Sequence, residues 1–312
     1  MTGFWLRRAA LVAACACAAL LAACGSSTIE SQLQPSRVVS FGDALSDVGA
    51  ARFTAKLSDG NLSIVSEQVA ASYGRPLTPT SAGGLGFAQG NARITAKPDA
   101  AGNSATLTVT EQIDAFLAAN TLGPNDLVLI NGGTSDIVAG MANTATVVAT
   151  AQQAGRDLAT QVRRLVAAGA KHVAVLNVYN LSKSPWATAT GQGALLSSAS
   201  RQFNDTLKLA LLDLGDTVLY VDIEGYMNLV TAAPTTHLGT GGTATGFVCN
   251  SVDTGNGIGI GANEVNSALC TSATLGAGLD PAKHVFADKL YFTPAVNRLV
   301  GVFAFGQIHA RW

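Results

Sequence analysis

Residues 37–43 read RVVSFGD, a short apolar run that ends in a Gly-Asp turn. A run of this length, bounded by a turn signal, is typical of a strand buried in a parallel sheet. Similar runs follow along the chain: DLVLIN at 126–131, HVAVLN at 172–177 and TVLYVD at 217–222. Residues 37–43 therefore begin a predicted series of buried parallel strands.

Helical segments separate these runs. Residues 149–168 place Val162 and Leu165 on one helical face, and residues 195–212 and 294–312 also favour helices. Strands that alternate with helices at this spacing require right-handed crossovers, so we predict an α/β fold, a three-layer α/β/α sandwich around a central parallel sheet. Functional sites in such folds form beyond the carboxyl ends of the strands.

Composition favours one large domain. The 312 residues are 48% hydrophobic and 12% charged, which is enough to bury a substantial core, and we assign residues 36–312 to it. The formal net charge is -1. This balance gives no reason to expect a nucleic-acid partner or polybasic attachment to anionic lipid.

The N-terminus has the pattern of an export signal. Arg7 and Arg8 precede an almost uncharged run of Ala, Leu, Val and Cys that reaches Ala23. The run is short for a membrane-spanning helix, which needs roughly 20 apolar residues. We therefore predict a signal peptide over residues 1–23.

The end of this signal, LAAC at 21–24, resembles the lipobox of bacterial lipoproteins. The resemblance implies cleavage before Cys24 and acylation of its thiol, which would anchor the protein in the envelope membrane. The absence of Asp after Cys24 points to the outer membrane, facing either the periplasm or the surface. Residues 24–35 are then a tether. The alternative is that Cys24 is one more small apolar residue, like Cys15 and Cys17.

Cys249 and Cys270 remain in the domain, inside or beside a stretch rich in Gly, Thr, Asn and Ser at 235–278. In an oxidising compartment such a pair predicts one disulfide that closes a loop. No His lies near them at metal-ligand spacing, so no metal site is expected. Disorder is the competing interpretation of this stretch.

Four segments, in order, resemble the conserved blocks of the SGNH/GDSL hydrolases. They are FGDALSDVG at 41–49 (block I), GLGFAQGNAR at 84–93 (block II), GTSD at 133–136 (block III) and FADKLYFTP at 286–294 (block V). The resemblance covers nearly the whole mature chain and is closest to secreted bacterial lipases and esterases. It implies the flavodoxin-like SGNH fold, an ester-hydrolase ancestry and no cofactor.

By this resemblance, several catalytic positions hold other side chains. Ala44 stands at the nucleophile position and Tyr291 at the position of the catalytic His, whereas Asp288, the orienting carboxylate, is retained. Gly90 stands at an oxyanion-hole position, and Ser135 replaces the usual oxyanion Asn. Serine catalysis needs a hydroxyl nucleophile and an imidazole base.

We therefore expect an impaired or inactive esterase that retains a pocket for a lipid or another small ester-bearing molecule. One alternative is a working esterase that uses Ser46 or Ser135 with an unexpected base such as His284. Another is a structural or assembly lipoprotein of the envelope with an unidentified protein partner. Asp43 and Asp47 are expected to cap the helix that follows them and to order the turn.

Overall fold

The computed structural model describes residues 33–49, 51–57 and 62–312 of the chain. The predicted signal peptide, Cys24 and residues 24–32 of the predicted tether lie outside the described residues. The folded unit runs from Leu33 to Trp312. It thus begins inside the segment predicted as a tether, because the Leu33 side chain is buried and its N–H donates to the Trp312 carbonyl at 3.1 Å.

The predicted strands form one parallel sheet in the order β1-β2-β3-β4. Their bounds are β1 (Arg37–Phe41), β2 (Asp126–Asn131), β3 (His172–Leu176) and β4 (Val218–Val221). Beside β1, Gly86 makes an isolated parallel bridge with Ser40, which extends this edge of the sheet. All six residues of β2 are buried, as expected for a strand with helices on both faces.

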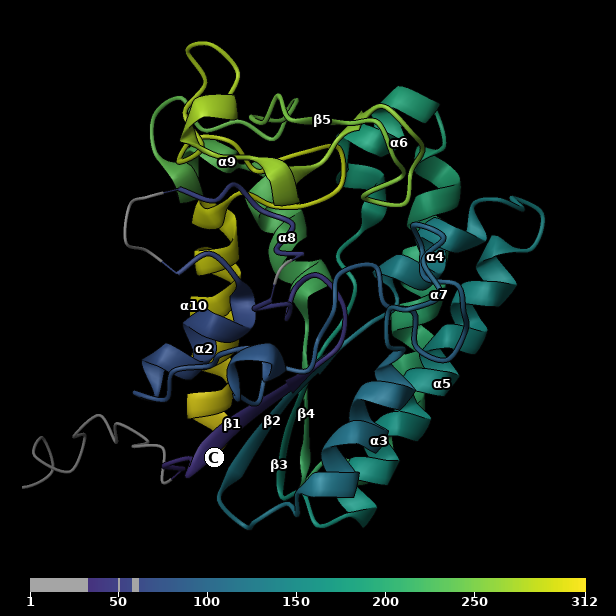
Figure 1. Ribbon diagram of the computed structural model, residues 1–312, viewed down its shortest axis with the longest axis vertical. Coiled ribbons are helices and arrows are strands. Elements are labelled where there is room, and N and C mark those ends of the chain that lie inside the picture. The colour runs from purple at the N-terminus through teal and green to yellow at the C-terminus, as the bar shows by residue number, and fades with distance from the viewer. Residues whose placement is uncertain (1–32, 50, 58–61) are drawn as a thin grey trace, which may run out of the picture. The chain divides into compact units, whose positions relative to one another are not determined.

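Helices cover both faces of the sheet (Figure 1). One face carries α3 (Val109–Ala119), α5 (Val147–Ala167) and α7 (Gly193–Ala210), and the other carries α2 (Val65–Ser72), α8 (Ile223–Ala232) and α10 (Pro294–Arg311). Shorter helices lie nearer the carboxyl ends of the strands: α4 (Thr134–Gly140), α6 (Pro185–Thr190) and α9 (Pro234–Leu238). The predicted three-layer α/β/α fold is confirmed.

The Gly-rich stretch from 235 to 278 packs against block V. It contains a two-stranded antiparallel ribbon, β5 (Val252–Asp253) and β6 (Glu264–Val265). Cys249 and Cys270, the predicted pair, form a disulfide with their Cα atoms 5.8 Å apart. The Cys249 N–H donates to the Ala287 carbonyl at 2.9 Å. The disulfide is therefore held directly beside Asp288.

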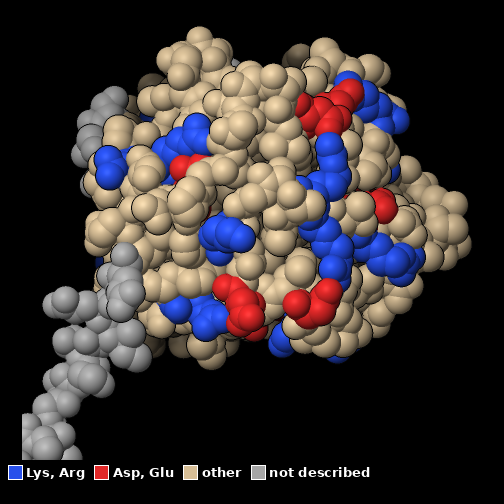
Figure 2. Space-filling view, turned by 90° about the horizontal axis from the view of Figure 1, so that it is seen from below, with Lys and Arg blue, Asp and Glu red and all other residues tan. Residues whose placement is uncertain are grey.

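Acidic and basic side chains lie close together on the face at which the strands begin (Figure 2). Arg37 pairs with Asp126 at the start of β1 and β2, with 2.9 Å between nitrogen and oxygen. Arg163 also pairs with Asp213. Within residues 33–49, 51–57 and 62–312, no helix combines the length and apolarity needed to cross a bilayer.

Candidate active site

The four blocks converge beyond the carboxyl end of the sheet. Block I follows β1 directly, and block III forms the start of α4 after β2. The Gly90 N–H of block II donates to Asp47 of block I. Burial, and then the charge of Asp43 in block I, raise the pKa of Tyr291 in block V. The fold therefore brings together the four segments that resemble the blocks of the SGNH/GDSL hydrolases.

The turn that carries Ala44 is fixed by a buried glutamine from α3. The Gln112 side chain accepts a hydrogen bond from the Gly42 N–H at 2.8 Å and donates to the Gly42 carbonyl at 3.0 Å. Gly42 has a φ of 137°. A Cβ atom there would lie 2.1 Å from Asn131 Oδ1, so only glycine fits this approach between β1 and β2.

Asp43 has a different partner from the one predicted. No helix follows block I directly, since the next is α2 at Val65. The Asp43 carboxylate instead accepts a hydrogen bond from the Asn131 side-chain amide at the end of β2, and its Oδ2 has no hydrogen-bond partner among the described residues. Asp43 thus joins the turn after β1 to the end of β2, and α4, whose N-cap is Gly133, has no side-chain cap hydrogen bond. The expectation that Asp43 caps the following helix was wrong because no helix begins at block I and its partner lies on the neighbouring strand.

Among the buried carboxylates at or beneath this site, which also include Asp47, we call Asp43, Asp136 and Asp288 the site carboxylates. Burial raises the pKa of Asp43 to about 6 and that of Asp136 to about 7, although hydrogen bonds to Asp43 and the nearby Arg93 charge oppose these shifts. Burial likewise raises the pKa of Asp288 to about 6. The site therefore holds carboxyl groups that titrate near neutral pH.

Ala44, at the position predicted for the nucleophile, carries only a methyl group. Its side chain is 4% exposed and belongs to the hydrophobic core. A methyl carbon has no lone pair with which to attack an ester carbonyl, and no neighbouring base can activate it. The position is therefore both chemically inert and shielded from solvent.

Gly90 and Ser135 are the two predicted oxyanion positions. The Gly90 N–H donates to Asp47 Oδ2 at 2.7 Å, so this donor is engaged within the protein. A Cβ atom on Gly90 would lie 2.5 Å from the Phe53 ring, which shows how closely that segment covers the block II loop. Ser135 is fully buried, and within the described chain its hydroxyl has no hydrogen-bond partner. An oxyanion hole requires free donors aimed at the reacting oxygen.

Tyr291, at the position predicted for the catalytic His, is a buried and stacked phenol. Its ring stacks on Phe53 with 4.5 Å between centroids and 9° between planes, and it is 5% exposed. Burial, and then the charges of Asp43 and Asp288, raise the pKa of Tyr291 well above its ordinary value. A phenol that stays protonated cannot accept a proton from a nucleophile, so Tyr291 is not a base.

Asp288, retained from the family pattern, has a local structural role. Its Oδ1 accepts hydrogen bonds from the backbone N–H groups of Leu290 at 2.8 Å and Tyr291 at 2.7 Å. Its Oδ2 accepts one from the Ser267 N–H at 3.0 Å, inside the disulfide-closed loop. Asp288 therefore joins the block V turn to this loop and orients no imidazole.

The alternative nucleophiles lack a base. The hydroxyls of Ser46 and Ser135 are buried, and neither forms a hydrogen bond with a histidine or with any other residue that the structure describes. His284, the alternative base, contacts the Asp280 carbonyl through Nδ1 at 2.9 Å. The remaining histidines pack against aromatic rings: His172 on Trp312, His237 on Tyr226 and His309 on Phe305.

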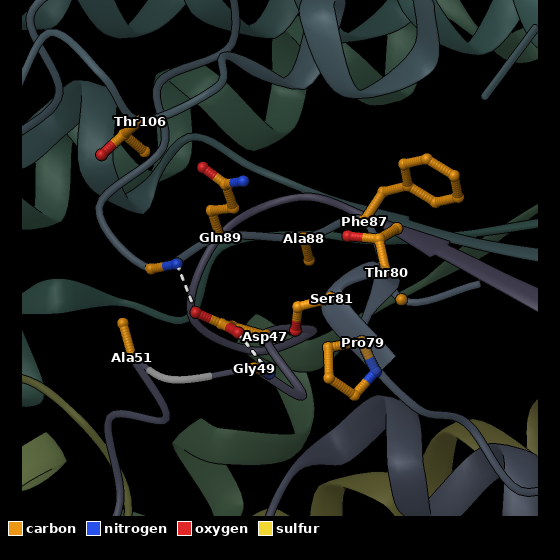
Figure 3. Close-up of a pocket in the computed structure, with 12 residues that line it drawn as sticks. Asp47, Gly49, Ala51, Pro79, Thr80, Ser81, Phe87, Ala88, Gln89 and Thr106 are labelled. Carbon is orange, nitrogen blue, oxygen red and sulfur yellow. Dashed lines mark hydrogen bonds between the residues drawn. The ribbon is translucent and has the colours of Figure 1, made fainter. Parts of the chain in front are cut away.

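An open hollow of about 260 Å³ lies beside this closed centre (Figure 3). Its lining includes Asp47, Ala51, Pro79, Phe87, Gln89 and Thr106. Dashed lines in Figure 3 mark the hydrogen bonds from Gly49 and Gly90 to Asp47. Block I and block II thus both contribute to the lining of the hollow. Polar and apolar groups share the lining, as in many small-ligand sites.

The structure also identifies residues that the sequence motifs did not single out. Phe53 and Gln112 lie outside all four blocks, yet one covers the base position and the other fixes the nucleophile turn. No local pattern marks either of them. Asp47 was expected to order a turn, and it does so by accepting a hydrogen bond from the Gly49 N–H. Its hydrogen bond from the Gly90 N–H could not be predicted, because only the fold brings block II beside block I. Within the described residues, no group of three or more His, Cys, Asp or Glu side chains could hold a metal ion.

Comparison with known proteins identifies one family and one distant relative. The family model described as GDSL-like Lipase/Acylhydrolase matches residues 38–301. A Pseudomonas putida protein described as "Uncharacterized protein in trpE-trpG intergenic region" is 26% identical over 306 residues. This match covers 89% of the chain but 49% of the relative, so the chain spans about half the length of that protein.

Proposed function

The chain belongs to the GDSL-like lipase/acylhydrolase family, and from this premise we propose that it is a lipid-anchored member that binds an ester-bearing molecule without serine-esterase turnover. The observation that carries the proposal is the buried methyl of Ala44 at the nucleophile position. In subtilisin, loss of the nucleophilic Ser alone lowers turnover by about 10⁶-fold, as much as loss of the whole triad.

Two further features support the loss of turnover. Tyr291 carries a protonated phenol where the mechanism requires a base, and its ring packs against Phe53. The Gly90 N–H is bound to Asp47 and is not free to stabilise an oxyanion. Since nucleophile, base and oxyanion donor are all affected, restoring any one of them would not restore the reaction.

The open hollow beside Asp47 and Gly90 supports a retained binding role. Its volume of about 260 Å³ lies near the lower end of small-molecule sites, which span roughly 300–1,000 Å³. The hollow suits an ester or acyl group of modest size. Anchoring in the outer membrane through Cys24 rests on the lipobox-like segment and remains part of the proposal.

A fluorophosphonate probe and short p-nitrophenyl esters test this proposal. We expect no labelling and no hydrolysis above background with the full-length protein. The double variant Ala44→Ser, Tyr291→His should gain serine labelling, since it restores both the nucleophile and the base. Adding Ser135→Asn should increase the rate further by about 10²–10³-fold, the usual contribution of one oxyanion donor.

The same assay separates the alternatives. Hydrolysis by the natural protein that disappears in Ser46→Ala or Ser135→Ala would establish a working esterase with rearranged chemistry and would refute the proposal. If hydrolysis is absent, affinity purification from envelope extracts distinguishes two roles. A co-purifying lipid or ester supports ligand binding, whereas a stoichiometric protein partner without such a ligand supports a structural or assembly role.

A further inference from the structure

A second groove lies on the layer that contains α10, between α9 and the first turns of α10. It has a volume of about 280 Å³. Its lining includes His237, Leu238, Ala282, Arg298, Leu299 and Val302, and we call it the α10 groove. Because Ala295, Arg298, Leu299 and Val302 are spaced three or four residues apart, they form one stripe along α10. The walls are therefore mostly apolar, with one guanidinium among them.

Arg298 is unusual in its lack of partners. Its Nη1 atom is shielded from solvent and has no hydrogen-bond acceptor among the described residues, and Arg298 forms no ion pair with them. Buried donors in native proteins almost always have an acceptor. A guanidinium presents a planar fork of donors that matches a carboxylate. The groove thus contains a cation for which the described residues supply no anion.

Neighbouring charges favour an anion as well. The Lys283 ammonium donates to the Leu238 carbonyl at 2.9 Å, which places a second cation beside the groove. His237 lines the groove itself. Asp280, which is acidic, lines an adjoining hollow that shares Arg298, and among the described residues no ion pair joins these two side chains. The local balance is therefore positive beside an apolar wall.

We propose that the α10 groove binds the anion of a single medium-chain fatty acid. The carboxylate pairs with the Arg298 guanidinium, and the acyl chain lies along Leu299 and Val302. A chain along the stripe from Ala295 to Val302 covers about 10 Å of helix, from a rise of 1.5 Å per residue. This site is separate from block I and block V, so it does not depend on the function proposed above.

Calorimetric titration of the full-length protein with octanoate tests the site. We expect one octanoate per chain, with acetate and octan-1-ol binding at least tenfold more weakly, because each lacks either the chain or the charge. Arg298→Gln should weaken octanoate binding by about ten- to a hundredfold, the usual effect of losing a charged hydrogen bond. Arg156→Gln, on the exposed face of α5, is the matched control and should leave binding unchanged.

Val302→Glu provides a second variant that is expected to fold, since Val302 is 56% exposed. Its new carboxylate should repel the ligand and weaken octanoate binding while leaving the melting temperature near that of the natural protein. Equal octanoate affinity in Arg298→Gln and the natural protein would overturn the proposal. So would equal affinity for octan-1-ol, absence of octanoate binding, or Arg298-dependent binding of phosphatidylglycerol vesicles without binding of free octanoate.

Discussion

Replacing Tyr291 by Phe should stabilise the protein, although it removes a side-chain group from the candidate active site. The Tyr291 hydroxyl is buried and has no hydrogen-bond partner within the described residues. A buried polar group without a partner costs about 1–3 kcal/mol of stability, and removal of the hydroxyl should recover this amount. The stack of the ring on Phe53 remains, because Phe keeps the ring.

The expected change can be measured as a melting temperature. The folded unit has about 280 residues, and an unfolding entropy of about 2.1 cal/mol/K per residue converts 1–3 kcal/mol into a rise of roughly 2–5 °C. Differential scanning calorimetry of the natural protein and Tyr291→Phe gives this shift directly. The rise in melting temperature is the outcome to test, because its size depends on how far neighbouring side chains move into the space of the lost hydroxyl.

Tyr179 is the matched control. It is also a buried tyrosine next to block V, but its hydroxyl donates to the Leu290 carbonyl at 2.6 Å. Tyr179→Phe leaves that carbonyl without its partner and should therefore lower stability by about 1–3 kcal/mol. Opposite shifts in the two variants are expected. A lower melting temperature for Tyr291→Phe would show that its hydroxyl has a partner, and the interpretation of Tyr291 as a space-filling group would be wrong.

Three other perturbations probe the supports of the site. The site carboxylates have folded-state pKa values raised to about 6 or 7, so the stability they contribute is complete below about pH 4 and is lost as pH rises through 6 to 7. The free energy of unfolding should thus be greater at pH 5 than at pH 8, by on the order of 1 kcal/mol per group, and the melting temperature should be higher at pH 5. A higher melting temperature at pH 8 would contradict this. The double variant Cys249→Ser, Cys270→Ser opens a loop with a sequence separation of 21 and should lose about 3 kcal/mol in urea denaturation, whereas an unchanged midpoint would argue against a stabilising bridge. Gln112→Leu leaves the Gly42 N–H unpaired and the Gly42 carbonyl with the Gln89 N–H as its donor, so it should lose about 1–3 kcal/mol in the same assay, and no measurable loss would rule out Gln112 as the support of the block I turn.

Local sequence patterns were sufficient to predict the architecture. The run at 126–131 became β2 with the predicted bounds, and the helical pattern at 149–168 became α5 at Val147–Ala167. Both predictions succeeded because alternation of buried strands and amphipathic helices is a property of short segments. The motif segments were recognisable for the same reason, since each block is contiguous in the chain.

The sequence by itself therefore determined the fold class and the family, and it predicts the loss of a nucleophile, because Ala44 lacks a reactive atom in any conformation. Only the tertiary structure decided how the remaining site is arranged. The stack of Phe53 on Tyr291, the hydrogen bond from Gly90 to Asp47 and the clamp of Gln112 on Gly42 each join segments far apart in the chain. Their geometry depends on how strands and loops pack together, which no local pattern of residues encodes.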